Sequence, residues 1–159
     1  MFSIEEISNA YRAFVDTQIT ERWAGPYVVS KGIIHDTRTH LGFVAVEKDD
    51  VVGYVLYNIA DKDCEITVLE SLHNGCGIGS ALINEVIQTA KESACQRIWL
   101  ITTNDNIHAI RFYQKFGFEL RSVYINTIED ARKLKSQIPL TGNDGIPIKH
   151  EFEFEKTFG

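Results

Sequence analysis

The sequence lacks several features that would each indicate a particular class of protein. It contains no apolar stretch long enough to span a membrane, and Glu5 and Glu6 come too early for a secretory signal peptide. It has no internal repeat and no low-complexity segment. The three cysteines, Cys64, Cys76 and Cys95, are odd in number and form no CxxC pair. This pattern favours reduced thiols, so we expect a cytoplasmic protein with no membrane partner.

Basic residues are neither abundant nor clustered. The chain has 16 Lys and Arg against 22 Asp and Glu, which gives a net charge of −6 at pH 7. Proteins that bind nucleic acids usually carry a basic face, so no nucleic-acid partner is expected. The negative charge instead suits a cationic acceptor molecule. No group of His, Cys and carboxylate residues has the spacing of metal ligands, so no metal is expected either.

The length and composition are those of a compact globular protein. With 159 residues, of which 44% are hydrophobic, the chain can bury a sizeable core without disulfides or metals. We expect a single domain over residues 1–159.

The first half of the chain predicts one helix and several strands. Ser3 and Glu6 have the spacing of a capping box, and apolar residues at helical spacing follow, so a helix is expected over residues 3–16 and a loop over 17–26. Short apolar stretches predict strands at 27–30, 41–47, 51–59 and 65–69. Tight turns separate the last three, which predicts an antiparallel meander. Residues 31–40, which include His35, have no clear pattern.

The second half alternates between helices and strands. Helices are expected at 79–94, 106–116 and 127–137, and strands at 97–103, 118–124 and 146–155. In the short helix, Ile128, Ala131 and Leu134 should point inward. The last strand alternates apolar residues with Lys149, Glu151, Glu153 and Glu155, which predicts that this charged set faces solvent. A strand–helix–strand crossover makes the strands at 65–69 and 97–103 parallel. The expected fold is α/β, with a mixed, mostly antiparallel sheet of about seven strands and helices on both faces.

A glycine-rich turn joins the strand at 65–69 to the helix at 79–94. It reads His73-Asn74-Gly75-Cys76-Gly77-Ile78-Gly79. Free N–H groups at a helix start can bind phosphate, although a tight connection would explain the turn equally well. The turn lacks the lysine of a P-loop. It also lacks the third glycine of the dinucleotide fingerprint, because Ser80 or Leu82 stands there.

Two segments together resemble the GCN5-related N-acetyltransferase superfamily. The first runs from Asn74 to Leu82 and matches that family's Gln/Arg-x-x-Gly-x-Gly/Ala phosphate turn, except that Asn74 replaces the usual Gln or Arg. The second is Asn104-Asp105-Asn106-Ile107-His108-Ala109-Ile110-Arg111-Phe112-Tyr113-Gln114-Lys115-Phe116-Gly117-Phe118. The likeness is firm over about residues 41–120 and looser outside.

The resemblance implies acetyl-CoA as cosubstrate and assigns residues to it. The family splays two strands apart to admit the pantetheine arm, which here would pair with backbone groups of Thr67, Val68 and Leu69, and the Leu69 N–H would face the thioester oxygen. Asn104, Asn106 and Arg111 would also contact the cofactor, although helix capping is the alternative role of the Asn104–Asn106 run. The pyrophosphate would be held by backbone N–H groups of Asn74, Gly75, Cys76, Gly77, Ile78, Gly79 and Ser80.

The same resemblance implies two catalytic residues. Tyr113 would be the general acid that donates a hydrogen bond to the leaving thiolate; a tyrosine packed in the core is the alternative. Glu65 would be the base, provided that its pKa is raised or a water relays the proton, because an ordinary glutamate is too weak a base for an alkylammonium. An exposed strand glutamate explains Glu65 equally well, and His35 is a second candidate base. Cys64 is expected in the core, so direct attack on the thioester is favoured.

The resulting hypothesis is an N-acetyltransferase that moves an acetyl group from acetyl-CoA to a primary amine. The acceptor stays open among small amines such as a polyamine, an antibiotic or an amino acid, and a protein N-terminus or lysine. A homodimer is expected by family analogy and from a half-exposed last strand. One alternative is a non-catalytic acyl-CoA binding or sensing module on the same fold. Another is a nucleotide-binding oxidoreductase, which the failed fingerprint disfavours.

Overall fold

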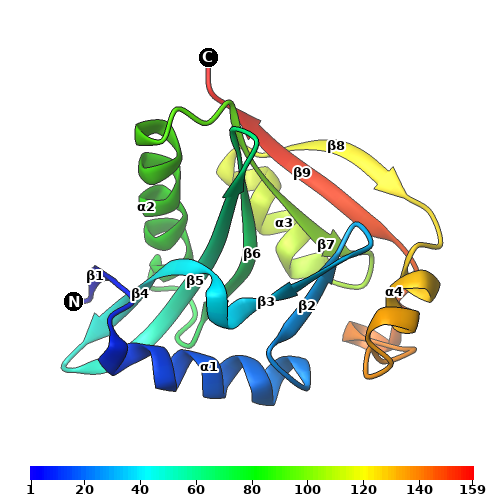
Figure 1. The fold of residues 1–159 in the computed structure, drawn as a ribbon, viewed down its shortest axis with the longest axis horizontal. Coiled ribbons are helices and arrows are strands. Elements are labelled where there is room, and N and C mark those ends of the chain that lie inside the picture. Colours follow the sequence, from blue (N-terminus) through cyan, green and yellow to red (C-terminus); the bar gives the residue numbers. More distant parts are fainter.

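The structure, a computed structural model, describes residues 1–159 and is built around one seven-stranded sheet (Figure 1). The spatial order of the strands is β1-β4-β5-β6-β7-β9-β8. Only β6 and β7 are parallel, and every other pair is antiparallel, so the predicted mixed, mostly antiparallel sheet is confirmed. The strands are β1 (Ser3–Glu6), β4 (Leu41–Glu47), β5 (Asp50–Ala60), β6 (Asp63–Ser71), β7 (Arg97–Thr103), β8 (Glu119–Tyr124) and β9 (Glu151–Thr157).

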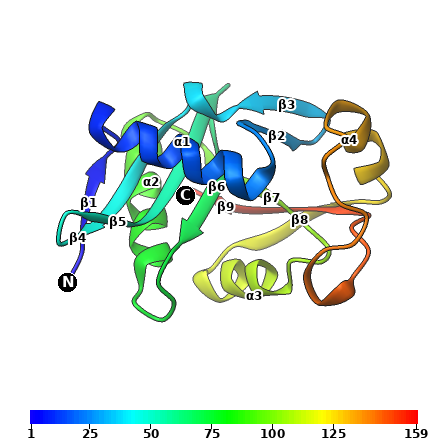
Figure 2. The ribbon, with the colours of Figure 1, turned by 90° about the horizontal axis from the view of Figure 1, so that it is seen from below.

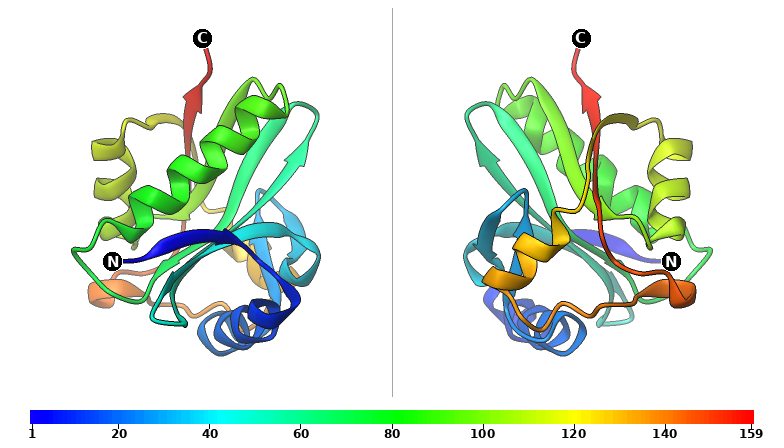
Figure 3. Two further views of the ribbon diagram at one scale, coloured as in Figure 1. Left: turned by 90° about the vertical axis from the view of Figure 1, so that its left-hand side faces the viewer. Right: turned by 90° about the vertical axis from the view of Figure 1, so that its right-hand side faces the viewer.

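Helices cover both faces of this sheet, as expected (Figure 3). On one face, α1 (Asn9–Trp23) buries Val15 and Ile19 against side chains of β4, β5 and β6. On the other, α2 (Ile78–Glu92) and α3 (Ile107–Phe116) cover the larger core. One face of α2 is buried; it consists of Ile78, Leu82, Ile83, Val86, Ile87 and Ala90. None of the helices combines the length and apolar character that crossing a bilayer requires.

The N-terminal segment differs from the prediction. Residues 3–6 form an edge strand on β4, with Ser3 opposite Val46, so the expected capping box does not exist. The helix begins at Asn9 and continues through the expected loop to Trp23, where Ala24 adopts a left-handed conformation. Pairing with a strand about forty residues away overrode the local helical pattern, as tertiary context often does.

Residues 27–36, partly unassigned from the sequence, form a separate hairpin of β2 (Tyr27–Ser30) and β3 (Ile33–Asp36). Its turn consists of Lys31 and Gly32, both with positive φ, as two-residue hairpin turns require. The hairpin lies beside α4 (Ile128–Leu134), on the same side of the sheet as α1 (Figure 2). The tip of the hairpin is bonded to the sheet. The Ser30 hydroxyl donates to a carboxylate of β6, and the Lys31 backbone N–H donates to a carboxylate of β9.

The last strand also corrects the prediction. β9 begins at Glu151 and lies between β7 and β8, so it is an interior strand and β8 is the sheet edge. Glu151 and Glu153, expected to face solvent, are both 2% exposed. The half-exposed last strand on which the expected homodimer partly rests is therefore absent. In α4, Ile128 and Ala131 are buried as predicted, but Leu134 is exposed.

Candidate active site

The sheet opens between its two parallel strands. The β6–β7 ladder pairs residues 63–66 with 97–100 and ends at Ile66 and Leu100. Beyond this point a cavity of about 420 Å³ separates the strands. Thr67, Val68 and Leu69 line one side and residues 101–103 the other. Thr67, Val68 and Leu69, which the resemblance assigns to the pantetheine arm, therefore have backbone groups that are not paired with β7.

A β-bulge accompanies this opening. Tyr57 of β5 pairs with Ile66 and Leu56 pairs with Val68, so Thr67 is the extra residue. The bulge also changes which way the following side chains point: Val68 packs in the α1-side core and Leu69 against the α2-side core. A strict period of two along the strand predicts that Glu65, Thr67 and Leu69 share one face, and the bulge makes this prediction wrong at Leu69. Thr67 points toward His40, whose Nδ1 lies 2.8 Å from its Oγ1.

The glycine turn leads directly into α2. Gly77 is the N-cap with φ +75°, and Gly75 has φ +76°, conformations that side chains rarely tolerate. The first helical hydrogen bond runs from the Ala81 N–H to the Gly77 carbonyl, so the N–H groups before it are free for an anion. This arrangement is the one expected of a phosphate-binding turn.

Beside the turn lies a second cleft of about 560 Å³ between α2 and α3. It is lined by Ser80, His108, Arg111, Phe112, Lys115 and Phe116. The resemblance assigns Arg111 to the cofactor, and the sequence analysis did not assign Lys115 to the site. The i, i+4 spacing of Arg111 and Lys115 on α3 is a signal that would have found it. Two cations here favour a group with several negative charges.

The Asn104–Asn106 run has mixed roles. Asn106 lines the cavity and its Oδ1 accepts the Ala109 N–H at 3.1 Å, so it caps α3. Asn104 is turned toward residues 147–150: its amide donates to the Pro147 carbonyl and accepts two backbone N–H groups. Asp105, which is 4% exposed, accepts the backbone and side-chain N–H groups of Asn143. Both therefore hold the loops that close one end of the cavity.

Tyr113 lies on α3 at the cavity wall. It is 6% exposed and packs edge to face against Phe112 and Phe118. Burial raises the pKa of its hydroxyl, so Tyr113 keeps its proton at any physiological pH. It can therefore donate a hydrogen bond into the cavity.

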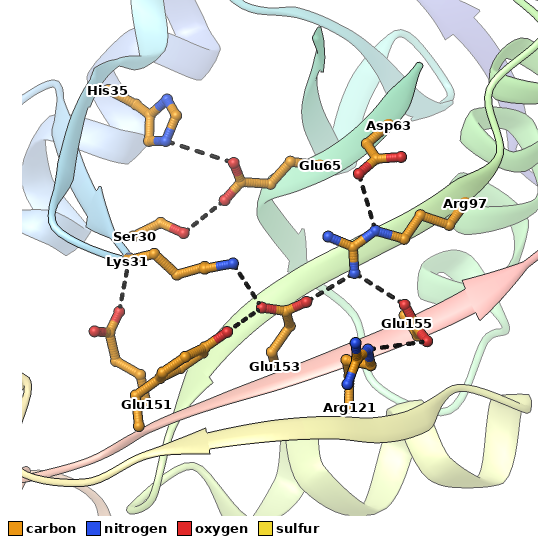
Figure 4. A network of polar contacts seen from close by, with 11 residues as sticks. Ser30, Lys31, His35, Asp63, Glu65, Arg97, Arg121, Glu151, Glu153 and Glu155 are labelled. Atoms are coloured by element: carbon orange, nitrogen blue, oxygen red, sulfur yellow. Dashed lines mark hydrogen bonds and ion pairs between the residues drawn. The ribbon is translucent and has the colours of Figure 1, made fainter. Parts of the chain in front are cut away.

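Glu65 is buried beneath the β2–β3 hairpin rather than exposed on a strand (Figure 4). Its Oε2 accepts the Ser30 hydroxyl at 2.7 Å, and its Oε1 lies 3.5 Å from His35 Nε2. Burial raises the pKa of Glu65 to about 7, and the Ser30 hydrogen bond and the Lys31 charge only partly oppose this. The pKa of His35 is lowered, also by burial. Glu65 does not line the cavity, so any proton that it receives from there must pass through a relay.

A carboxylate that sequence reasoning missed does line the cavity. Glu151, at the start of β9, is one of the lining residues, and its Oε2 accepts the Lys31 backbone N–H at 3.2 Å. The walls formed by α1, β2, α4 and the loop before β9 are largely apolar. Their apolar lining residues include Trp23, Val28, Val29, Ile128, Ile138 and Ile148.

Comparison with known proteins agrees with this geometry. The family model described as "Acetyltransferase (GNAT) family" matches residues 5–118. The uncharacterised protein YdhI of Bacillus subtilis is 44% identical over 138 residues, which cover 86% of each chain. The spermine/spermidine N(1)-acetyltransferase of the same organism is 33% identical over 81 residues, 44% of this chain and 53% of that relative.

Solved structures share the fold over its whole length. The IAA acetyltransferase from Bacillus cereus superposes with a TM-score of 0.72 at 21% identity and covers 99% of this chain and 100% of its own. A GNAT acetyltransferase from Elizabethkingia anophelis, solved with acetyl-CoA bound, gives a TM-score of 0.71 at 15% identity, with 99% and 98% covered.

Proposed function

Because this chain belongs to the GNAT acetyltransferase family, we propose that it moves an acetyl group from acetyl-CoA to a primary amine by direct attack on the thioester. The observation that carries the proposal is the cavity that opens where the β6–β7 ladder ends. Unpaired β6 backbone, Tyr113 and the buried Glu151 carboxylate all line this cavity, which supports the proposal. Membership of the family supports acetyl transfer as the reaction, and the cavity supports this part of the chain as its site.

Acetyl-CoA fits the residues that surround this space. The free N–H groups of the glycine turn would hold the pyrophosphate, and Arg111 and Lys115 would add positive charge beside it. Thr67, Val68 and Leu69 would pair with the pantetheine arm, and Asn106 would contact the arm from α3. When bound, the cosubstrate supplies a thioester whose carbonyl carbon is open to a nucleophile.

The chain's own residues would then handle charge and protons. The Leu69 N–H would stabilise the developing oxyanion, and the Tyr113 hydroxyl would donate a hydrogen bond to the departing sulfur. Glu65, with a pKa of about 7, would finally accept the proton of the amine. Because Glu65 lies behind the cavity wall, we propose that this proton moves through an intervening hydroxyl or water rather than directly.

Release of the CoA thiol, measured with a thiol reagent on a panel of primary amines, tests the proposal. Amine-dependent release that ceases with tertiary amines of similar shape would support transfer to nitrogen. Tight acetyl-CoA binding with no amine-dependent release from any acceptor class would favour the non-catalytic acyl-CoA module. Absence of acetyl-CoA binding by the folded protein would refute both.

A further inference from the structure

Resting on the proposed function, we propose that the acceptor is a primary monoamine with an apolar body, and that Glu151 binds its ammonium group. The proposal starts from the charge balance around Glu151. Its side chain is 2% exposed, yet no Lys, Arg or His nitrogen lies within ion-pair distance of it. Its one protein partner is the Lys31 backbone N–H. A buried carboxylate without a cation costs free energy, which a bound ammonium would recover.

The neighbouring cations are already engaged elsewhere. The Lys31 ammonium bonds Glu153 at 2.9 Å (Figure 4). It also lies 4.9 Å from the centre of the Trp99 ring. Arg97 bonds Asp63, Glu153 and Glu155. Glu151 lines the cavity, and only its Oε2 has a protein partner, so it can accept further hydrogen bonds. An ammonium bound there would also lie near the proposed base, since the Glu151 charge contributes to the raised pKa of Glu65.

The rest of the acceptor side suits an apolar body. Trp23, Val29 and Ile148 are among the apolar residues of its walls, and a hydrocarbon chain or ring would gain from burial against them. The charged residues of these walls other than Glu151 are the cations Arg22 and Lys135. The Lys135 ammonium donates to the Tyr27 carbonyl at 2.6 Å.

A polyamine fits this arrangement poorly. Its second ammonium would lie among apolar side chains and near Lys135, with no second cavity carboxylate to receive it. This distinguishes the chain from its relative named as a spermine/spermidine acetyltransferase, to which it is similar over 44% of its length. In this chain the acceptor side of the cavity is formed by α1, β2 and α4, which supply its apolar walls.

Hexylamine and hexamethylenediamine form a matched pair for the test, because they differ only in a second amine at the far end of the chain. With acetyl-CoA saturating, we expect kcat/KM for hexylamine to exceed that for the diamine and for spermidine by about 10-fold or more. Glu151→Gln should raise KM for hexylamine about 10- to 100-fold, with KM for acetyl-CoA unchanged. Glu155→Gln is the matched control, since it removes an ion-paired carboxylate from the same strand away from the cavity.

The possible outcomes test the inferred acceptor and the proposed acetyltransferase function separately. Turnover of spermidine equal to or better than hexylamine, or equal KM values for hexylamine in the two variants, would overturn the inference and leave the acetyltransferase function standing. Acetyl-CoA binding with no turnover of any monoamine would also overturn it. Failure of acetyl-CoA itself to bind would instead refute the proposed function. Circular dichroism of Glu151→Gln confirms that a kinetic change does not come from unfolding.

Discussion

Glu151 and Glu153 lie two residues apart on the same face of β9 and are equally buried, but only Glu153 has cations beside it. Burial alone would raise the pKa of Glu153, yet hydrogen bonds from Arg97, Lys31 and Tyr124 lower it to about 2. One carboxylate therefore holds the hairpin, β7 and β8 together. The Glu151 carboxylate has no cation beside it and is available to bind a ligand.

This difference predicts opposite effects on stability. Glu153→Gln should lower the free energy of unfolding at pH 7 by roughly 2–3 kcal/mol, because it breaks a buried ionic network. The lowered pKa means that this contribution is present above about pH 4.5 and is lost as the pH falls toward 2. Glu151→Gln should leave stability unchanged or higher. Urea unfolding at pH 7 and pH 3 measures both variants, and equal losses at pH 7 would contradict the distinction.

The contribution of Glu65 to stability depends on pH in the opposite direction to that of Glu153. Its folded-state pKa of about 7 lies above its usual 4.5, so the folded protein retains a proton that the unfolded chain releases. The stability that this group confers is present below about pH 4.5 and is lost as the pH rises through 7. Glu65→Gln should therefore raise the melting temperature at pH 8 but not at pH 4. A melting curve that shifts equally at both pH values would contradict the raised pKa.

The same residue makes a kinetic prediction. If Glu65 accepts the proton, kcat/KM should fall on the acid side with an apparent pKa near 7. In Glu65→Gln this limb should disappear and the rate should drop by about 100-fold. His35→Gln serves as the control, because its ring contacts Glu65 and is the second candidate base. Loss of the limb in the His35 variant alone would assign the role to His35.

The turn of the cofactor site can be tested with two glycines in matched conformations. Gly77 and Gly145 have φ +75° and +74°, and a Cβ would meet no atom within 4 Å at either. Replacement by Glu therefore puts a side chain on a positive-φ residue at both sites, which costs about 1 kcal/mol at each. Acetyl-CoA at about 100 times its dissociation constant should stabilise wild type and Gly145→Glu by roughly 2.7 kcal/mol, but not Gly77→Glu. Equal thermal shifts in the two variants would exclude the turn as the phosphate site.

Tyr113→Phe should separate binding from chemistry. The ring packs between Phe112 and Phe118, so a phenylalanine keeps the core intact and removes only the hydroxyl. We expect kcat to fall by about 100-fold, while the thermal shift with acetyl-CoA is retained. An unchanged kcat would show that the leaving thiolate departs without help from Tyr113.

The sequence by itself determined the parts of this protein that depend on neighbours along the chain. Three features are fixed by a few adjacent residues each: the glycine turn before α2, the Asn106 cap of α3 and the end of α3 at Gly117. These carry the cofactor motifs, which is why the family could be inferred from the sequence. The order of strands and helices along the chain likewise predicted a mixed, mostly antiparallel sheet.

Only the tertiary structure decided the acceptor side. Residues 3–6 became a strand because β4 offered them an edge, and the bulge at Thr67 turned Leu69 away from Glu65. The last strand looked half solvated because its charged residues alternate, yet the hairpin covers that face. The Lys31 N–H that bonds Glu151 comes from 120 residues away, and no local pattern encodes such a contact. Burial of a charge depends on distant partners, and those partners meet only when the sheet is complete.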